Sequence, residues 1–205
     1  MVMKTLGISA SPRLDGNTDV LLRRALDGAG QAGSQTELLR LCEYRLEGCT
    51  ECESCRVTGS CGVGDDYGLI QEKMLAADRL IFATPVFFMT VSGQAKLLID
   101  RGQCLWVRKT VLGRRVIDPP RDRRGMIIAV GGSGDHKQFE CVRRTVRSCF
   151  DYLEVSFVSG LFVNHVDEKG AVRRRPDALA EAFRLGRELV GEGPVPEKPV
   201  CVELS

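Results

Sequence analysis

Four cysteines stand close together at Cys49, Cys52, Cys55 and Cys61, in the spacing Cys-x-x-Cys-x-x-Cys-x5-Cys. Thiolates are the soft ligands that iron–sulfur clusters prefer, and tight Cys-x-x-Cys steps let one loop supply several of them. Neighbouring glycines give the backbone freedom to wrap around a metal centre, and no histidine is near. The spacing favours a [4Fe–4S] cluster held by these four thiolates.

Two other readings of the four cysteines stay open. Zinc also accepts four thiolates, although its usual signature is two Cys-x-x-Cys pairs separated by a long spacer. The loop could also hold no metal and act through redox-active thiols. The other cysteines are scattered, and most of them are interpreted as small, buried apolar residues: Cys42, Cys104, Cys141, Cys149 and Cys201. The two histidines are assigned no chemistry.

The composition predicts one domain over residues 1–205, with 43% hydrophobic and 27% charged residues. A net charge of +2 gives no reason to expect nucleic acid or an anionic membrane as the main partner, so a small or soluble partner is expected. The N-terminus does not resemble a signal peptide, and no apolar stretch approaches the roughly 20 residues of a membrane helix. We therefore expect a cytoplasmic protein whose cysteines are kept reduced.

Short apolar runs alternate with helical patterns along the chain. Because five continuous apolar strands are typical of a sheet covered on both faces, the sequence predicts an α/β doubly wound fold with five parallel strands and helices on both faces. The cysteine loop covers about 46–66, an insertion rich in arginine and proline covers about 104–124, and the tail from Gly191 is expected to be loosely ordered. The predicted strands are Lys4–Ile8, Gln35–Leu41, Arg79–Thr84, Gly125–Val130 and Glu154–Val163.

Three loops should lie at the carboxyl edge of this sheet, where open parallel sheets bind ligands. The loop Ser9–Thr18 is rich in hydroxyl groups and precedes a helix, whose free amides and dipole favour an anion such as a terminal phosphate. It matches neither a Walker A loop nor a Gly-x-Gly-x-x-Gly turn. A polar turn that merely caps the helix is the alternative.

The other two loops offer apolar side chains and bare backbone. Pro85–Gly93 carries two phenylalanines and a methionine that could lie along a flat heterocycle, although such residues are more often core. Gly131–Gly134 could let the backbone approach a ligand closely. Each loop is a weak signal by itself. Together they indicate a ligand site, because all three are expected at the same edge of the sheet.

Three segments together carry a family resemblance. Ser11–Thr18 reads Ser-Pro-Arg-x-x-Gly-Asn-Thr, Ala83–Phe87 reads Ala-Thr-Pro-Val-Phe, and Gln94–Arg101 reads Gln-Ala-Lys-x-x-x-Asp-Arg. Together they resemble the NADPH-dependent FMN reductases, over about Lys4 to Val163. The cysteine loop, which ends in Asp65-Asp66, is similar to that of the iron–sulfur flavoproteins of this superfamily.

The resemblance implies a flavodoxin-like fold that holds FMN. The family often has a tyrosine where Phe87 stands, so a hydroxyl contact is missing while the apolar wall remains. Relatives of this type form dimers or tetramers, so a homodimer or homotetramer is expected. The resemblance implies phosphate contacts from Ser9, Ser11, Arg13, Asn17 and Thr18, ring contacts from Pro85, Val86, Phe87 and Phe88, and contacts to the far edge of the ring from Gly131, Gly132 and Ser133.

The expected function is electron transfer through FMN, which supplies the chemistry, so no catalytic acid or base is required. NAD(P)H is a possible co-substrate, a quinone or another small molecule is the expected acceptor, and ferredoxin is a possible donor if a cluster is present. The alternatives are a cluster-free reductase, a flavin-bound redox sensor, and a zinc-stabilised interaction domain without flavin. The arginine runs Arg121–Arg124 and Arg173–Arg175 are read as solvated surface, with the first as a candidate site for an NADPH phosphate.

Overall fold

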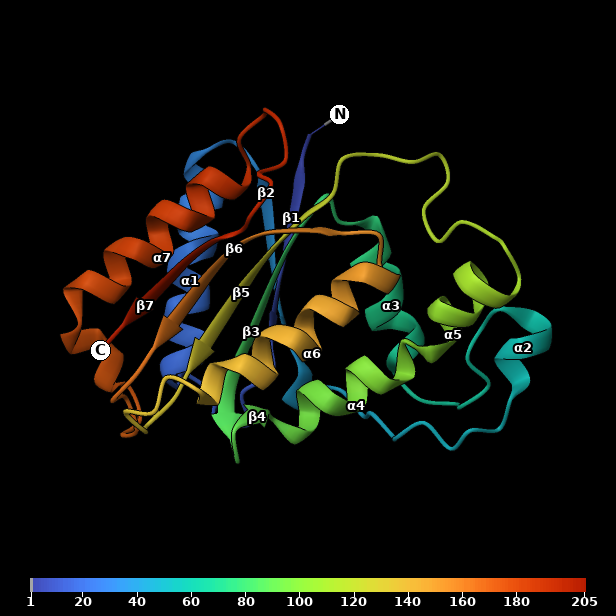
Figure 1. Ribbon diagram of the computed structural model, residues 1–205, viewed down its shortest axis with the longest axis horizontal. Coiled ribbons are helices and arrows are strands. Elements are labelled where there is room, and N and C mark those ends of the chain that lie inside the picture. Colours follow the sequence, from blue (N-terminus) through green and yellow to red (C-terminus); the bar gives the residue numbers. More distant parts are fainter. Residues whose placement is uncertain (1) are drawn as a thin grey trace.

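The computed structural model describes residues 2–205 as one central sheet with helices on both faces (Figure 1). The strand order is β2-β1-β3-β5-β6-β7, all parallel, and a short β4 pairs antiparallel with β3. The order reverses between β1 and β3, which is where open α/β sheets bind ligands. The strands are β1 (Lys4–Ser9), β2 (Gln35–Arg40), β3 (Arg79–Phe87), β4 (Thr90–Val91), β5 (Arg124–Val130), β6 (Ser156–Val163) and β7 (Val200–Leu204).

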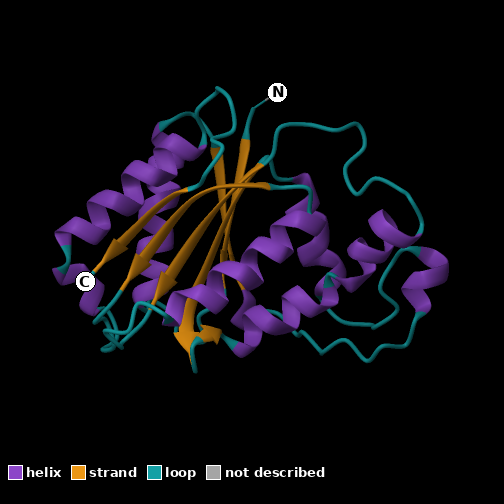
Figure 2. Cartoon of the chain, viewed as in Figure 1, coloured by secondary structure: helices purple, strands orange, loops and turns teal. Residues whose placement is uncertain are grey.

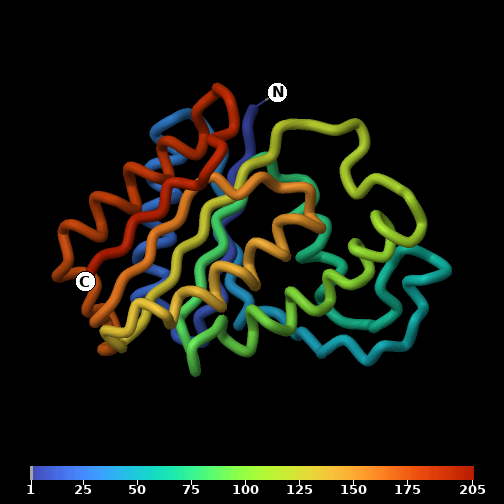
Figure 3. The backbone as a smooth tube through the Cα atoms, viewed as in Figure 1, coloured from blue at the N-terminus to red at the C-terminus, as the bar shows by residue number. Residues whose placement is uncertain are grey.

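The helices form two layers around the sheet (Figure 2). Helices α1 (Asn17–Gln31) and α7 (Pro176–Leu189) cover one face, and their apolar sides enclose one hydrophobic core. The other face carries α3 (Tyr67–Ala76), α4 (Gly93–Arg101), α5 (Gln103–Trp106) and α6 (Gln138–Tyr152) over a second core. The short α2 (Ser54–Thr58) lies away from the sheet with the cysteine loop (Figure 3). Short helical turns cover Leu41–Glu43, Val107–Val111 and Ala171–Arg174.

This architecture confirms the predicted flavodoxin-like fold, with one more parallel strand than expected. The prediction of a loosely ordered tail is wrong for β7, which pairs with β6 from Ser159 to Val163. Val202 and Leu204 pack against the core of the α1 and α7 layer, so the tail completes the sheet. Within residues 2–205, no helix is long and apolar enough to span a bilayer.

Three buried arginines lie at the amino edge of the sheet. Arg79, Arg123 and Arg124 are only 1%, 2% and 9% exposed, so reading 121–124 as solvated surface is wrong for Arg123 and Arg124. Because the six strands of the main sheet are parallel, the covering helices end at this edge with unpaired carbonyls and negative dipole ends. Burial lowers the pKa of Arg123 to about 10.

These arginines close the ends of three helices. Arg123 donates to Met74 and Ala77 at the end of α3 and to Leu153 after α6. The Nε atom of Arg79 donates to Leu189 O of α7 at 2.8 Å. The guanidinium groups thus satisfy carbonyls inside the fold.

Helices α1 and α7 approach each other backbone to backbone. A Cβ atom on Gly186 would lie 2.0 Å from the carbonyl oxygen of Ala25, and one on Gly28 would lie 2.1 Å from that of Phe183. Such distances leave no room for a methyl group in a close-packed interior. Glycine at these two positions sets the separation of the two helices.

We expect Gly186→Ala to lower the free energy of unfolding by about 1–3 kcal/mol, because the methyl group must push two backbones apart. Gly68→Ala in α3 is the matched control, since a Cβ there meets nothing within 4 Å and alanine favours helix. Urea unfolding followed by circular dichroism measures both. Equal stability of the two variants would contradict this account of the helix contact.

Candidate functional site

A pocket of about 80 Å³ opens at the carboxyl edge of the sheet, and we call it the strand-end pocket. Loops after β1, β3, β5 and β6 line it, so the three loops predicted to meet do so, together with a fourth. Its lining residues are Ser11, Pro12, Arg13, Gly16, Asn17, Thr18, Pro85, Val86, Phe87, Val130, Gly132, Val166, Asp167 and Lys169.

The loop after β1 presents the start of α1 to the pocket. Gly16 is the N-cap residue of α1, so no side chain caps the first amides of the helix. The Ser11 hydroxyl accepts a hydrogen bond from Arg13 N and donates one to Arg13 O, both at 3.1 Å. These two bonds fix the turn. Uncapped amides beside Arg13 form an environment that favours an anion.

A buried carboxylate supports this loop from below. Asp19 accepts hydrogen bonds from the Ser9 hydroxyl, from Asp15 N at 3.1 Å and from Arg40 Nε at 3.2 Å. The side chain of Asp19 is 1% exposed, so its charge is compensated inside the protein. Ser9 therefore points at Asp19 and lies outside the strand-end pocket, although sequence reasoning placed it there.

The loop after β3 is a tight hairpin. Strand β3 continues past Thr84 to Phe87 and turns back at Phe88 and Met89, both with positive φ. Pro85, Val86 and Phe87 line the pocket, whereas Phe88 is fully exposed and lies outside it. The contact of Phe88 with the ring stays a prediction, for a side chain that does not line the pocket.

The loop after β5 contributes only Gly132 among its three predicted residues. A Cβ on Gly131 would lie 2.1 Å from the Gln138 side chain, so that position faces α6. The Ser133 hydroxyl accepts from Asp135 N at 3.1 Å and shapes its own turn. Gly132 is thus the one of these three predicted residues that lines the pocket.

Sequence reasoning missed the loop after β6. Val166, Asp167 and Lys169 line the strand-end pocket, and Asn17 Nδ2 fastens this loop to α1 by donating to Glu168 O at 2.8 Å. The signal that could have found it is position, because the loop follows a parallel strand at the same edge as the others. Lys169 adds a second cation beside Arg13.

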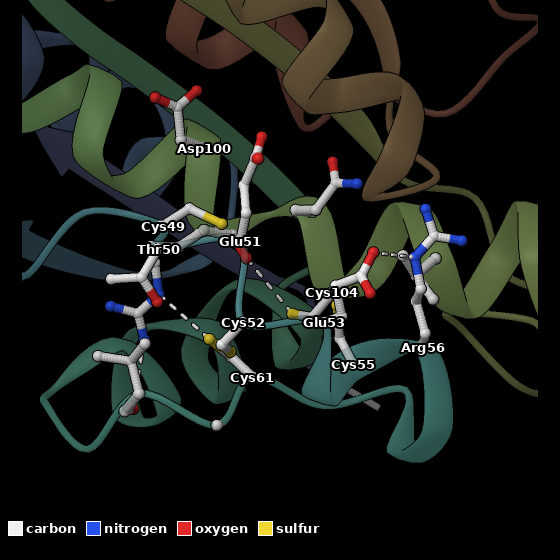
Figure 4. A pocket seen from close by; sticks show the side chains of 15 residues that line it. Cys49, Thr50, Glu51, Cys52, Glu53, Cys55, Arg56, Cys61, Asp100 and Cys104 are labelled. Carbon is white, nitrogen blue, oxygen red and sulfur yellow. Dashed lines mark hydrogen bonds and ion pairs between the residues drawn. The ribbon is translucent and has the colours of Figure 1, made fainter.

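A second hollow, of about 530 Å³, lies beside α2, and we call it the cysteine cavity (Figure 4). Cys49, Cys52, Cys55 and Cys61 all line it, so the structure brings the four predicted ligands to one place. Cys104 lines it as well, at the edge of the core in which it is buried as expected. Cys149 is also buried, whereas the expectation of burial is wrong for the three exposed cysteines, Cys42, Cys141 and Cys201. Across residues 2–205, no three cysteine, histidine or acidic side chains converge closely enough to hold a single metal ion.

The thiols of the cavity differ in their surroundings. Cys49 and Cys52 are exposed, and hydrogen bonds from Ser54 lower the pKa of Cys52. Burial raises the pKa of Cys55 and of Cys104. Cys104 Sγ lies 3.6 Å from the Tyr67 hydroxyl, at the boundary between cavity and core.

One arginine at the end of α4 holds the cysteine loop. Arg101 Nη1 and Nη2 donate to the Asp65 carboxylate at 2.6 and 3.0 Å, and Nη1 also donates to Glu47 O at 2.9 Å. Its Nε lies 3.2 Å from Cys61 Sγ, and its guanidinium lies 4.7 Å from the centre of the Tyr67 ring. Burial alone would raise the pKa of Asp65, but hydrogen bonds from Arg101 and two backbone amides hold it below its usual value. Both ends of the loop are thereby tied to α4.

Comparison with known proteins agrees with this geometry. Residues 3–167 match the family model described as NADPH-dependent FMN reductase. An iron–sulfur flavoprotein of Methanosarcina thermophila is 33% identical over 93% of this chain and 91% of its own length. One of Methanocaldococcus jannaschii is 39% identical over 64% of this chain, and the match spans 63% of that relative's length.

Solved structures show the same fold. The NAD(P)H:quinone oxidoreductase from Methanothermobacter marburgensis superposes with a TM-score of 0.69 at 20% identity, over 95% of this chain and 99% of its own. The family model covers most of the chain and includes the loops after β1, β3 and β5, the cysteine loop and α4. The resemblance seen in the sequence is therefore confirmed, and the chain belongs to the NADPH-dependent FMN reductase family of oxidoreductases.

Proposed function

We propose that this protein is an FMN-dependent electron-transfer oxidoreductase that also holds a [4Fe–4S] cluster. FMN would occupy the strand-end pocket, and the cluster would be bound by Cys49, Cys52, Cys55 and Cys61. Electrons would pass between NAD(P)H or ferredoxin and a quinone or another small acceptor. The observation that carries the proposal is that all four cysteines line one cavity, in a chain whose relatives are named iron–sulfur flavoproteins.

The strand-end pocket fits FMN in charge and shape. The start of α1, Arg13 and Lys169 provide amides and cations for a terminal phosphate. A volume of about 80 Å³ is small, so the enclosed part suits the phosphate end. The flat ring would lie along Val86 and the half-exposed Phe87 at the mouth.

Bound FMN would supply the redox chemistry, since it exchanges electrons in pairs with a nicotinamide and singly with other carriers. The role of this chain is to fix the cofactor. Asp19 holds the first loop through the Ser9 hydroxyl and Asp15 N. Ser92 joins that loop to the end of β3, because its hydroxyl donates to Ala10 O at 2.6 Å while its own amide donates to Thr84 Oγ1 at 3.1 Å.

The cysteine cavity fits a cluster in its donor chemistry and its size. Thiolates are the ligands of [4Fe–4S] clusters, and about 530 Å³ leaves room for a group much larger than one ion. The ligands of a four-iron cluster surround a cube and stand further apart than those of a single ion. The preference for a cluster over zinc rests on the size of the cavity and on cysteines that run together in one loop, without the long spacer between two Cys-x-x-Cys pairs that is usual for zinc.

The second candidate is a cluster-free NAD(P)H-dependent FMN or quinone reductase, or a redox sensor, in which the same loop works through its thiols. The observation that favours it is the exposure of Cys49 and Cys52, together with the lowered pKa of Cys52, which promotes the reactive thiolate. The metal content of the protein separates the two candidates.

Protein purified without oxygen is expected to contain FMN and about four irons and four sulfides per chain. Cys52→Ser should lose the iron and keep the FMN, because the two sites use different residues. Cys42→Ser is the control, since Cys42 lies outside both pockets, and it should keep both groups. Iron, sulfide, zinc and released flavin are measured on the same sample, and full iron and sulfide in Cys52→Ser would rule out this ligand set.

Arg13→Gln is expected to weaken FMN binding roughly 10- to 100-fold, the loss typical of one hydrogen bond to a charged group. Riboflavin, which lacks the phosphate, should bind the variant and the unchanged protein equally well. Arg184→Gln on the exposed side of α7 is the control. Fluorescence titration of the flavin-free protein measures each affinity, and an equal loss for riboflavin would show that Arg13 does not contact the phosphate.

A further inference from the structure

The segment Gln94–Arg101 carries part of the family resemblance and ends in Asp100-Arg101, two residues that line the cysteine cavity. Arg101 is the last residue of α4, and its side chain is fully buried. A buried guanidinium must find acceptors for its donors, because an unpaired charge in the interior is costly. The partners of Arg101 therefore indicate what it does.

Those partners all belong to the cysteine loop and its exit. The two Nη atoms donate hydrogen bonds to the Asp65 carboxylate and to the carbonyl oxygens of Glu47 and Val63. The remaining donor, Nε, points at Cys61 Sγ at 3.2 Å, within hydrogen-bond range for sulfur. Asp65 fixes this direction, because a two-pronged contact with a carboxylate leaves the guanidinium no freedom to turn.

This hydrogen bond makes the four thiols unequal. Among the four, within residues 2–205, only Cys61 receives a hydrogen bond from a charged donor, while Cys52 contacts the neutral hydroxyl of Ser54 at 3.4 Å. Hydrogen bonds to cluster sulfurs and nearby positive charge are among the factors that set the potential of an iron–sulfur centre. Both stabilise the reduced centre, which carries one more negative charge.

We propose that Arg101 is a positioning residue for the cluster: oriented by Asp65, it donates a hydrogen bond to the Cys61 ligand and raises the reduction potential of the centre. The inference rests on the proposed function, since it requires a cluster on Cys61. Reduction of the cluster takes one electron from a one-electron donor, and the electron stays on the cluster. Arg101 keeps its proton in this step. Arg101 also ties the loop ends together when the cluster is absent.

The test is a redox titration of the cluster-loaded protein with dithionite, followed by electron paramagnetic resonance. Arg101→Lys keeps a positive charge beside Asp65 and loses the Nε donor. We expect its reduced-to-oxidised ratio at a fixed solution potential to fall about tenfold, which corresponds to a potential about 59 mV lower for one electron. Lys96→Gln removes a positive charge from the exposed side of the same helix and should leave the potential unchanged.

The outcomes separate the two proposals. Unchanged protein without iron would overturn the proposed function, whereas a loaded Arg101→Lys protein with the original potential would overturn the role of Arg101 alone. A purely structural role would lower the iron content and leave the potential of the remaining cluster unchanged.

A second measurement needs no variant and covers the case in which Arg101→Lys does not fold. Unchanged protein labelled with ¹⁵N-arginine is reduced and examined by pulsed electron paramagnetic resonance. A nitrogen so close to a ligand sulfur should give a ¹⁵N coupling to the reduced cluster that unlabelled protein lacks. Absence of that coupling in iron-loaded protein would contradict the proposed hydrogen bond.

Discussion

The cysteine loop depends on one buried ion pair. Arg101 and Asp65 are both 0% exposed in their side chains, and neither charge could remain there without the other. Asp65 also accepts from Glu47 N and Tyr67 N, so the pair joins the entry of the loop, its exit and the start of α3 to α4. A loop with positive φ at Glu51 and Glu53 and few apolar anchors is thereby given a fixed shape. The cavity exists because this pair holds its walls.

The fold could be predicted from the sequence because its strands are continuous apolar runs, which only a doubly covered parallel sheet can bury. Strand β7 was missed because it is short, half-exposed and preceded by a proline-rich segment, so its order comes from pairing with β6. The arginines at 123 and 124 were misread for a related reason. A run of charged residues in a sequence is normally read as solvent-exposed. Here the ends of three helices meet at one edge of the sheet, and their carbonyl groups accept hydrogen bonds from the buried arginines.

The strand-end pocket was predicted in outline, and three of the residues predicted for it make local contacts in the structure. Ser9 donates to Asp19, a Cβ on Gly131 would meet Gln138, and the Ser133 hydroxyl accepts from Asp135 N. The residues that contact a cofactor and the residues that shape its binding loop are of the same types. A sequence motif therefore cannot tell which of the two roles a given residue has. Phe87 and Phe88 were separated by the hairpin, because β3 continues to Phe87 and turns at the next residue.

Helix α4 connects the two pockets. At its start, Ser92 caps the helix and donates to Ala10 O in the first loop of the strand-end pocket. At its end, Arg101 holds the cysteine loop. A helix of nine residues is roughly 13 Å long at about 1.5 Å per residue, and both of its ends are fixed by buried hydrogen bonds. The distance between Ser92 and Arg101 is therefore set by a rigid helix. Because no flexible segment lies between them, a substitution at Ser92 changes the geometry of the strand-end pocket and one at Arg101 changes that of the cysteine cavity.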